Sequence, residues 1–561
     1  MRKVFHIDDY LDRSRGCDAT QAVIDMIAAV RENGGGTIVF FKGEYHFYAH
    51  EAQQHTCYPY GCGGSQKTAF LLTQMKDVTV DGGGSDFVFH GIIVPFICDG
   101  SKNIVLENFK VSYDRPFHTE LLVTGRDEKT GSFECVLDRE HYPTHTEDGH
   151  FDAFTPYMEL TQGNSLLTEY DAVRKEPAYS STYYVLDRGQ SPDGKYGGGF
   201  FGWYWTEETG TDTLRMYMPG KQLPRVGNVM TYLNDGRPCV SAFIHESENV
   251  TLRNADVFDS GGMCIVGQLS RDIFLDSVRM RLAEKGEIGY IPGRVVSASA
   301  DATHFLCCMG KLSMTNCVFD NMLDDGTNIH GMYRFICGTE GKHTFIIKNS
   351  EPDTASYYRE GDTVSAVKMT DFQEIVHAVV KEVRQDGAIT RVTVDGDVSC
   401  VPCSGYALDN LTTAPDEVHI SNVKTGSNRP RGFLIATLGK VLIENCTFHN
   451  SSSGIHMQPF GEVCMESQGV EDVTIRDCRF VNCGFSDNAP AINIAPAVLE
   501  GIAPVHRNIT VTGCRFETFG APSISANNTA NLCIKDNTFV KTSDYDPMAF
   551  CRQVILQDCN I

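Results

Sequence analysis

Three aspartates stand where a repeating fold would bring them together. Asp324 and Asp325 lie in MLDDGTNIHG, residues 322–331, and Asp301 lies in SADATHF, residues 299–305, which is 23 residues before Asp324. If 23 residues make one coil of a stacked β-fold, residues one coil apart lie at the strand spacing of roughly 4.8 Å. Like charges this close cannot all ionise, so the pKa of one carboxyl rises while another stays ionised. We expect both acids of the pair to face solvent, and an acid beside a base is what cleavage of a glycosidic bond requires.

Two other interpretations of the doubled aspartate compete with this one. An Asp-Asp-Gly run in isolation is most often a turn, and the partner one coil earlier argues against that here. Aspartates together with Asn328 also suit calcium or another hard cation. His304 and His330 argue mildly against calcium because imidazole is a poor ligand for it, and for each histidine a structural hydrogen bond is as reasonable as a substrate contact. We therefore expect no metal at this cluster.

The coil length comes from a short segment that recurs along the chain. Alternating apolar residues lead into a small or polar residue, a variable position and often Phe, as in VLIENCTF, VTIRDCRF and ITVTGCRF. Several neighbouring copies are 22 or 23 residues apart, as Val250 is from Ile273. Short strands of period two with no helix between them predict a right-handed parallel β-helix rather than an α/β fold, with a β-sandwich as the alternative. The aligned copies place one column of residues inside the solenoid: Cys317, Cys446, Cys478, Cys514, Asn537 and Cys559.

The ends and interruptions of the solenoid are also visible. Asp18 is placed to cap a helix with apolar residues at helical spacing, and a glycine run ends that helix before the first strand, as in pectin-lyase-like β-helix proteins. Solenoids need such caps to cover their terminal coils. Two segments break the pattern with longer alternating strands and turn signals, and we expect small β-barrels there. The predicted order is a cap with the first coils (1–113), a barrel-like insert (114–240), central coils with the catalytic site (241–332), a second barrel-like insert (333–414) and C-terminal coils (415–561).

The bulk composition disfavours several kinds of partner. With 72 acidic against 48 basic side chains, the formal net charge is -24, which opposes binding to nucleic acids and to anionic membranes. No run approaches the roughly 20 apolar residues that span a bilayer. The N-terminus has scattered charges in place of the apolar core of a secretory signal, so we expect a cytoplasmic protein, or a secreted one if a signal was removed. The 21 cysteines lack the spacing of a zinc site, and we expect most of them to be reduced core residues.

Four motifs together resemble glycoside hydrolase family 110, the α-1,3-galactosidases that remove terminal α-galactose from structures such as the blood group B antigen. They are SADATHF, LDDGTNIHG, RGFLIATLGKVLIENCTF and ESQGVEDVTIRDCRF. The resemblance runs from about residue 1 to the C-terminus and is weakest in the two inserts. It implies a parallel β-helix with β-barrel inserts, exo-hydrolysis of a glycan ending in α-galactose with inversion at the anomeric carbon, no cofactor, and often a homodimer.

The same resemblance assigns roles to individual residues. It implies that Asp301, Asp324 and Asp325 are the catalytic acids. The implied substrate contacts are His304, Asn328, His330, Glu360, Arg431 and Glu466. Members of the family commonly show an aliphatic run and a tryptophan shortly before the ESG-like motif, whereas this chain reads SGIHMQPFGEVCMESQG. We therefore expect the leaving-group side of the substrate to differ.

Three rival functions remain. A polygalacturonase-type β-helix enzyme also uses three aspartates followed by His-Gly, but it needs basic residues for the galacturonate carboxylates, and no Arg-x-Lys signature follows at a suitable distance. A polysaccharide lyase needs a Lys or Arg base and usually calcium, whereas the only charged cluster here is acidic. A carbohydrate-binding β-helix without turnover would use the same carboxylates to bind sugar hydroxyls.

Overall fold

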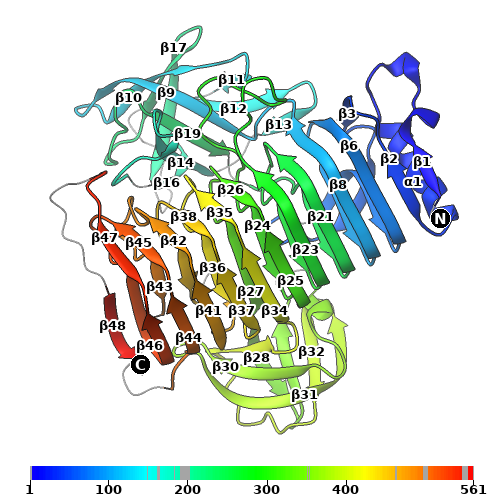
Figure 1. The fold of residues 1–561 in the computed structure, drawn as a ribbon, viewed down its shortest axis with the longest axis vertical. Helices are drawn as coiled ribbons and strands as arrows, with labels where there is room; N and C mark the ends of the chain where they lie inside the picture. Colours follow the sequence, from blue (N-terminus) through cyan, green and yellow to red (C-terminus); the bar gives the residue numbers. More distant parts are fainter. Residues whose placement is uncertain are drawn as a thin grey trace.

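The chain folds as a parallel β-helix interrupted by two inserts (Figure 1). The computed structural model describes residues 3–559 apart from 63, 148, 161–163, 182, 190–201, 235, 350–351, 353, 462–463, 497–502 and 546–553. The predicted solenoid is confirmed, and the β-sandwich alternative is wrong. No helix in these described ranges is long and apolar enough to cross a membrane.

Successive coils add strands in parallel register. β21 (Glu248–Val257) pairs with β23 (Arg271–Met280), and Val250 stands opposite Ile273, as the spacing predicts. One face of the solenoid consists of short strands that follow one another from coil to coil. They include β7 (Val94–Asp99), β20 (Ala242–His245), β22 (Ile265–Gln268), β24 (Thr303–Leu306), β27 (Thr327–Met332), β36 (Phe433–Ala436) and β39 (Ile455–Met457).

The recurring segment stacks identical side chains inside the solenoid. The rings of Phe448, Phe480 and Phe516 lie face to face, with centroids 4.7 Å and 4.8 Å apart. The cysteines of the segment form a second buried column, and Cys317, Cys446, Cys478 and Cys514 are each at most 2% exposed. Towards the C-terminal end Asn537 and Cys559 are only half-buried. The predicted inward column is therefore complete in the middle coils and opens at the end of the solenoid.

The small or polar residue before each cysteine marks a corner of the coil. Asn445, Asp477 and Gly513 have φ of 54°, 54° and 66°. L-residues with a branched or bulky side chain rarely adopt this left-handed conformation, whereas Asn, Asp and Gly do. The residue types at this position follow from the backbone turn between two strands.

A helix covers the N-terminal end of the solenoid. α1 (Thr20–Glu32) buries the predicted apolar face with Val23, Met26, Ile27 and Val30. Asp18 Oδ1 accepts the Thr20 backbone N–H at 2.9 Å, although Ala19 and not Asp18 occupies the N-cap position.

The strands of both inserts close on themselves, as the predicted barrels require. The first insert runs from β9 (His118–Asp127) to β19 (Val229–Asn234), and its eight-stranded sheet is closed into a ring by the pairing of β14 (Asn164–Asp171) with β19. The second runs from β28 (Arg334–Glu340) to β33 (Tyr406–Asn410) and closes into a barrel. In the view of Figure 1 they lie at the top and the bottom of the solenoid, and the face with the short strands passes between them.

Candidate active site

The three aspartates meet in the turns that precede two neighbouring short strands. Asp301 lies just before β24 and Asp325 just before β27. Carboxylate oxygens of Asp301, Asp324 and Asp325 lie within 4.8 Å of one another. Thr303 stands opposite Thr327, so this coil is 24 residues long and the neighbour of Asp301 is Asp325. The spacing of 23 residues to Asp324 is one residue short of the true register.

Exposure separates the three acids. Asp301 and Asp325 are 3% and 1% exposed, whereas the Asp324 side chain is 18% exposed. The expectation that both acids of the pair face solvent is wrong for Asp325. Its carboxylate is buried because the next coil supplies Arg431 as a partner, which compensates the charge.

Arginine neutralises two of the three carboxylates. Arg431 donates from Nε and from its backbone N–H to Asp325 Oδ1 at 2.9 Å and 3.1 Å, and its Nη2 lies 2.9 Å from Oδ2. Arg237 donates to Asp324 Oδ2 at 2.7 Å. Neither guanidinium forms an ion pair with Asp301 in the part of the chain that the structure describes. Asp301 is therefore the carboxyl for which ionisation is least compensated.

Burial and the nearby charge of Asp324 together raise the pKa of Asp301 to about 8. Burial raises the pKa of Asp325 to about 8 as well, although the Arg431 guanidinium opposes that rise. Three N–H donors aimed at the Asp325 carboxylate favour its ionised form. Because the Arg431 guanidinium pairs with Asp325 and not with Asp301, we conclude that Asp325 is ionised and that the proton of the cluster resides on Asp301.

A chain of ring nitrogens leads to the same conclusion. Burial lowers the pKa of His304 and of His330 to about 4, so both rings are neutral. His330 Nδ1 lies 2.5 Å from the Gly331 carbonyl oxygen and must donate to it. His330 Nε2 then accepts from His304 Nε2 at 2.8 Å, which leaves His304 Nδ1 as an acceptor. Only a protonated Asp301 can donate to it across the 2.7 Å from Oδ2.

These bonds occupy both ring nitrogens of each histidine. His304 and His330 therefore hold the Asp301 proton in place, and neither has a nitrogen left for a sugar hydroxyl. The Tyr60 ring stacks on His304 with a centroid distance of 4.8 Å, and the Tyr60 hydroxyl donates to the Cys464 carbonyl at 2.8 Å. Two loops 404 residues apart in sequence thus meet over the histidines.

Unused acceptors lie on the side of the cluster towards β40 (Glu466–Ser467). This short strand pairs antiparallel with β27, and Asn328 Nδ2 donates to Glu466 Oε1 at 3.0 Å. Asn328 Oδ1 and Glu466 Oε2 are buried and have no hydrogen-bond partner among the described residues. Such acceptors are open to hydrogen bonds from water or from the hydroxyls of a ligand.

The structure does not bring Glu360 into this group. Glu360 is exposed, and the neighbouring Arg359 donates to Glu246, past the C-terminal end of β20. Sequence patterns missed Arg237 and Tyr60, which reach the site from the linker after the first insert and from an N-terminal loop. Neither lies at a coil spacing from the aspartates, so the repeat gave no signal for them.

The cluster has the donor set of a hard-cation site, because three carboxylates lie within reach of one ion. However, Arg237 and Arg431 already neutralise the two ionised members, and the third holds a proton. Little negative charge remains to attract a divalent cation. The arrangement suits a proton donor beside ionised carboxylates better than metal binding.

Comparison with known proteins places the chain among carbohydrate-active β-helices. Residues 409–561 match the family described as a right handed beta helix region. The chain is 30% identical to Alpha-1,3-galactosidase A of Shewanella woodyi over 94% of its own length and 84% of that protein. It is 28% identical to Alpha-1,3-galactosidase B of Bacteroides thetaiotaomicron over 99% of its own length and 89% of that protein. A solved Family 28 exopolygalacturonase of Yersinia enterocolitica aligns over 100% of this chain and 78% of that one with a TM-score of 0.41 and 8% identity, values too low to bear on the substrate.

Proposed function

Because this chain belongs to the α-1,3-galactosidases and is a glycoside hydrolase that removes α-linked galactose, we propose that Asp301, Asp324 and Asp325 carry out the cleavage. The observation that supports this most directly is the division of the cluster into one protonated acid and two ionised carboxylates. Cleavage of a glycosidic bond needs an acid for the leaving oxygen and a base or nucleophile for the anomeric carbon.

Asp301 is the general acid in this proposal. Its raised pKa keeps the cluster's proton at neutral pH, and transfer of that proton to the leaving oxygen breaks the hydrogen bond from Asp301 Oδ2 to His304 Nδ1. Asp325 is the base, since it is ionised and fixed in orientation by Arg431. Asp324 is more exposed and paired with Arg237, where its charge stabilises the positive charge that develops on the sugar ring.

We propose that the reaction inverts the anomeric centre, as the family resemblance implies. A carboxylate held by a guanidinium on both oxygens is a weak nucleophile but orients a water well. The oxygens lie within 4.8 Å of one another, which is closer than the roughly 6.5 to 9.5 Å between the carboxyl groups of most inverting enzymes. The released anomer is therefore the decisive measurement for this part of the proposal.

The terminal galactose binds, in this proposal, on the side of Asn328 and Glu466. Their unpartnered oxygens accept hydrogen bonds from sugar hydroxyls, which always carry a donor. An exo-acting enzyme needs such an enclosed place for one sugar. A polygalacturonase would need free cations for carboxylates, but the described cations beside the cluster, Arg237 and Arg431, are both ion-paired.

The test is hydrolysis of p-nitrophenyl α-galactoside and of an α-1,3-linked galactose disaccharide by the wild-type chain and by Asp324→Asn. We expect galactose release by the wild type and a severe loss in the variant. Binding of either compound without hydrolysis by the wild type would show instead a sugar-binding protein without turnover.

A further inference from the structure

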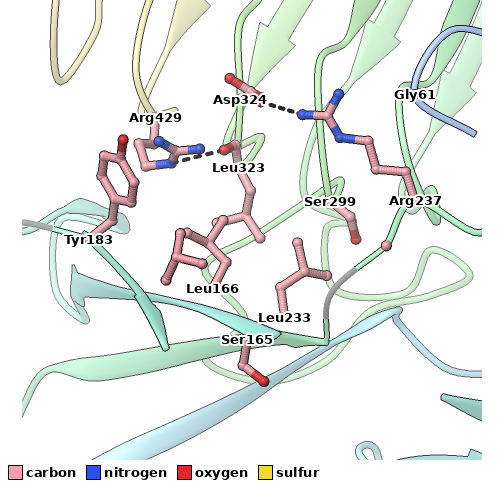
Figure 2. A pocket seen from close by; sticks show the side chains of 12 residues that line it. Gly61, Ser165, Leu166, Tyr183, Leu233, Arg237, Ser299, Leu323, Asp324 and Arg429 are labelled. Carbon is pink, nitrogen blue, oxygen red and sulfur yellow. Dashed lines mark hydrogen bonds and ion pairs between the residues drawn. The ribbon is translucent and has the colours of Figure 1, made fainter. Parts of the chain in front are cut away.

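A cavity of about 400 Å³ opens beside Asp324, between the first insert and the β-helix (Figure 2). This volume is within the range of ligand-binding pockets. In Figure 2 Tyr183 and Arg429 lie at the left of the cavity, Arg237 lies at the right, and Asp324 lies between them at the top. One wall therefore ends at the catalytic cluster.

The insert and the β-helix contribute different chemistry to this cavity. From the insert come apolar side chains of its sheet, among them Leu166 of β14 and Leu233 of β19. From the β-helix come Ser299, two residues before Asp301, and Leu323, next to Asp324. The cavity thus joins an apolar floor to a polar rim at the aspartates, which suits a sugar ring with its apolar faces and its hydroxyl edge.

Tyr183 of β16 (Tyr183–Arg188) supplies an aromatic surface. The Arg429 guanidinium lies 4.2 Å from the centroid of its ring, and Arg429 Nε donates to the Leu323 carbonyl oxygen at 3.1 Å. These contacts hold the ring in place from one side, yet Tyr183 remains 49% exposed. An aromatic ring that is already immobilised loses little further entropy when a ligand packs on its open face.

We propose that this cavity is the leaving-group subsite, which holds the saccharide to which the galactose is attached. The inference rests on the proposed function, because it assigns the two sides of the aspartate cluster to two parts of one substrate. Asn328 and Glu466 with their unused acceptors lie on the side towards β40. The cavity opens at Asp324, where the first insert faces the solenoid. A glycosidic oxygen at the cluster then joins a galactose on one side to a neutral sugar stacked on Tyr183 on the other.

The test compares two substrates that share the galactose and differ in the leaving group. An α-1,3-linked galactose disaccharide fills both sides of the cluster, whereas α-galactosyl fluoride has a single atom as its leaving group. For Tyr183→Ala we expect kcat/KM on the disaccharide to fall by about tenfold and kcat/KM on the fluoride to stay unchanged. Tyr183→Phe keeps the ring and should retain activity on both substrates.

Two further variants make the result independent of one side chain. Leu166→Trp fills the cavity, and we expect the same selective loss on the disaccharide. Tyr157→Ala removes another exposed tyrosine of the first insert, 43% exposed and outside the cavity lining, and should change neither substrate.

The outcomes separate this inference from the proposed function. An equal loss on both substrates, or no loss on either, in folded Tyr183→Ala and Leu166→Trp would overturn the leaving-group subsite. Failure of the wild type to hydrolyse the fluoride and the disaccharide would instead overturn the proposed function.

Discussion

The Asp301 carboxyl lies 2.7 Å from Nδ1 of His304 and must donate to it, because the other nitrogen of that ring is committed as a donor. The Gly331 backbone carbonyl determines this arrangement. It accepts a hydrogen bond from His330 Nδ1 and thereby sets the tautomers of both rings. A carbonyl oxygen can only accept a hydrogen bond, so the direction of each bond in the series is determined. The fold thus determines which of three neighbouring aspartates holds the proton.

Asp301→Asn should abolish hydrolysis of the α-1,3-linked disaccharide while sparing α-galactosyl fluoride. Fluoride leaves without protonation, so it does not need the general acid, whereas a sugar alkoxide does. We expect a loss of about 100-fold or more in kcat on the disaccharide and a small change on the fluoride. Asp325→Asn is the matched variant and should lose both activities. Equal loss on both substrates in Asp301→Asn would mean that Asp301 is not the acid.

The alkaline limb of the pH profile should depend on the substrate. Since the acid must be protonated and burial raises the pKa of Asp301 to about 8, kcat/KM on the disaccharide should fall as the pH rises through about 8. Hydrolysis of α-galactosyl fluoride by the same enzyme does not need a general acid, so kcat/KM on the fluoride should not fall as the pH rises through about 8. Identical alkaline limbs for the two substrates would assign the titration to another group.

Substitution by Asn should change the free energy of unfolding in opposite directions at the two buried aspartates, Asp301 and Asp325. A carboxyl with a folded-state pKa above its unfolded value loses stability as the pH rises from about 4 to about 8. Asn at position 301 can donate to His304 and accept from the Asp325 N–H, so Asp301→Asn should raise the free energy of unfolding at pH 7 by about 2 kcal/mol. This gain should vanish below pH 4.

Asp325→Asn removes the partner of Arg431 and leaves a largely buried guanidinium unpaired. It should lower the free energy of unfolding by about 3 kcal/mol. Urea denaturation of both variants at pH 4 and pH 7 measures the difference. Destabilisation by Asp301→Asn at pH 7 would contradict a protonated Asp301.

The sequence allowed the solenoid and the aspartate cluster to be predicted because both depend on the local repeat. Strands of period two and the coil spacing bring Asp301 near Asp325 without any knowledge of distant contacts. The single-residue error in register arose because coil length varies at the turns. The second insert separates Arg431 from the aspartates, and Arg237 follows the first insert at no coil spacing from them. The burial of Asp325 and the location of the proton depend on these two arginines. These features follow from tertiary contacts that the repeat does not encode.

The first-formed sugar should be β-galactose. If Asp325 orients a water rather than attacking the sugar, a single displacement converts the α-linkage into the β-anomer. Proton NMR during the first minutes of hydrolysis, before mutarotation, distinguishes the two anomers. Initial α-galactose would mean a double displacement, which the short spacing of the carboxylate oxygens would then explain.

Glu466→Gln should weaken recognition of the galactose itself. Glu466 Oε1 can keep its hydrogen bond from Asn328, so the substitution chiefly converts the unpartnered Oε2 from an acceptor into a donor. A sugar hydroxyl that donates to Oε2 in the wild type then faces an N–H group. Two donors cannot bond to each other, so this buried hydrogen bond is lost. We expect kcat/KM to fall by about 10-fold to 100-fold on the disaccharide and on α-galactosyl fluoride alike, with weaker inhibition by free galactose. Glu248→Gln, at an exposed glutamate paired with Lys102, serves as the control and should change neither value. A loss confined to the disaccharide would place Glu466 on the leaving-group side and exchange the two subsites.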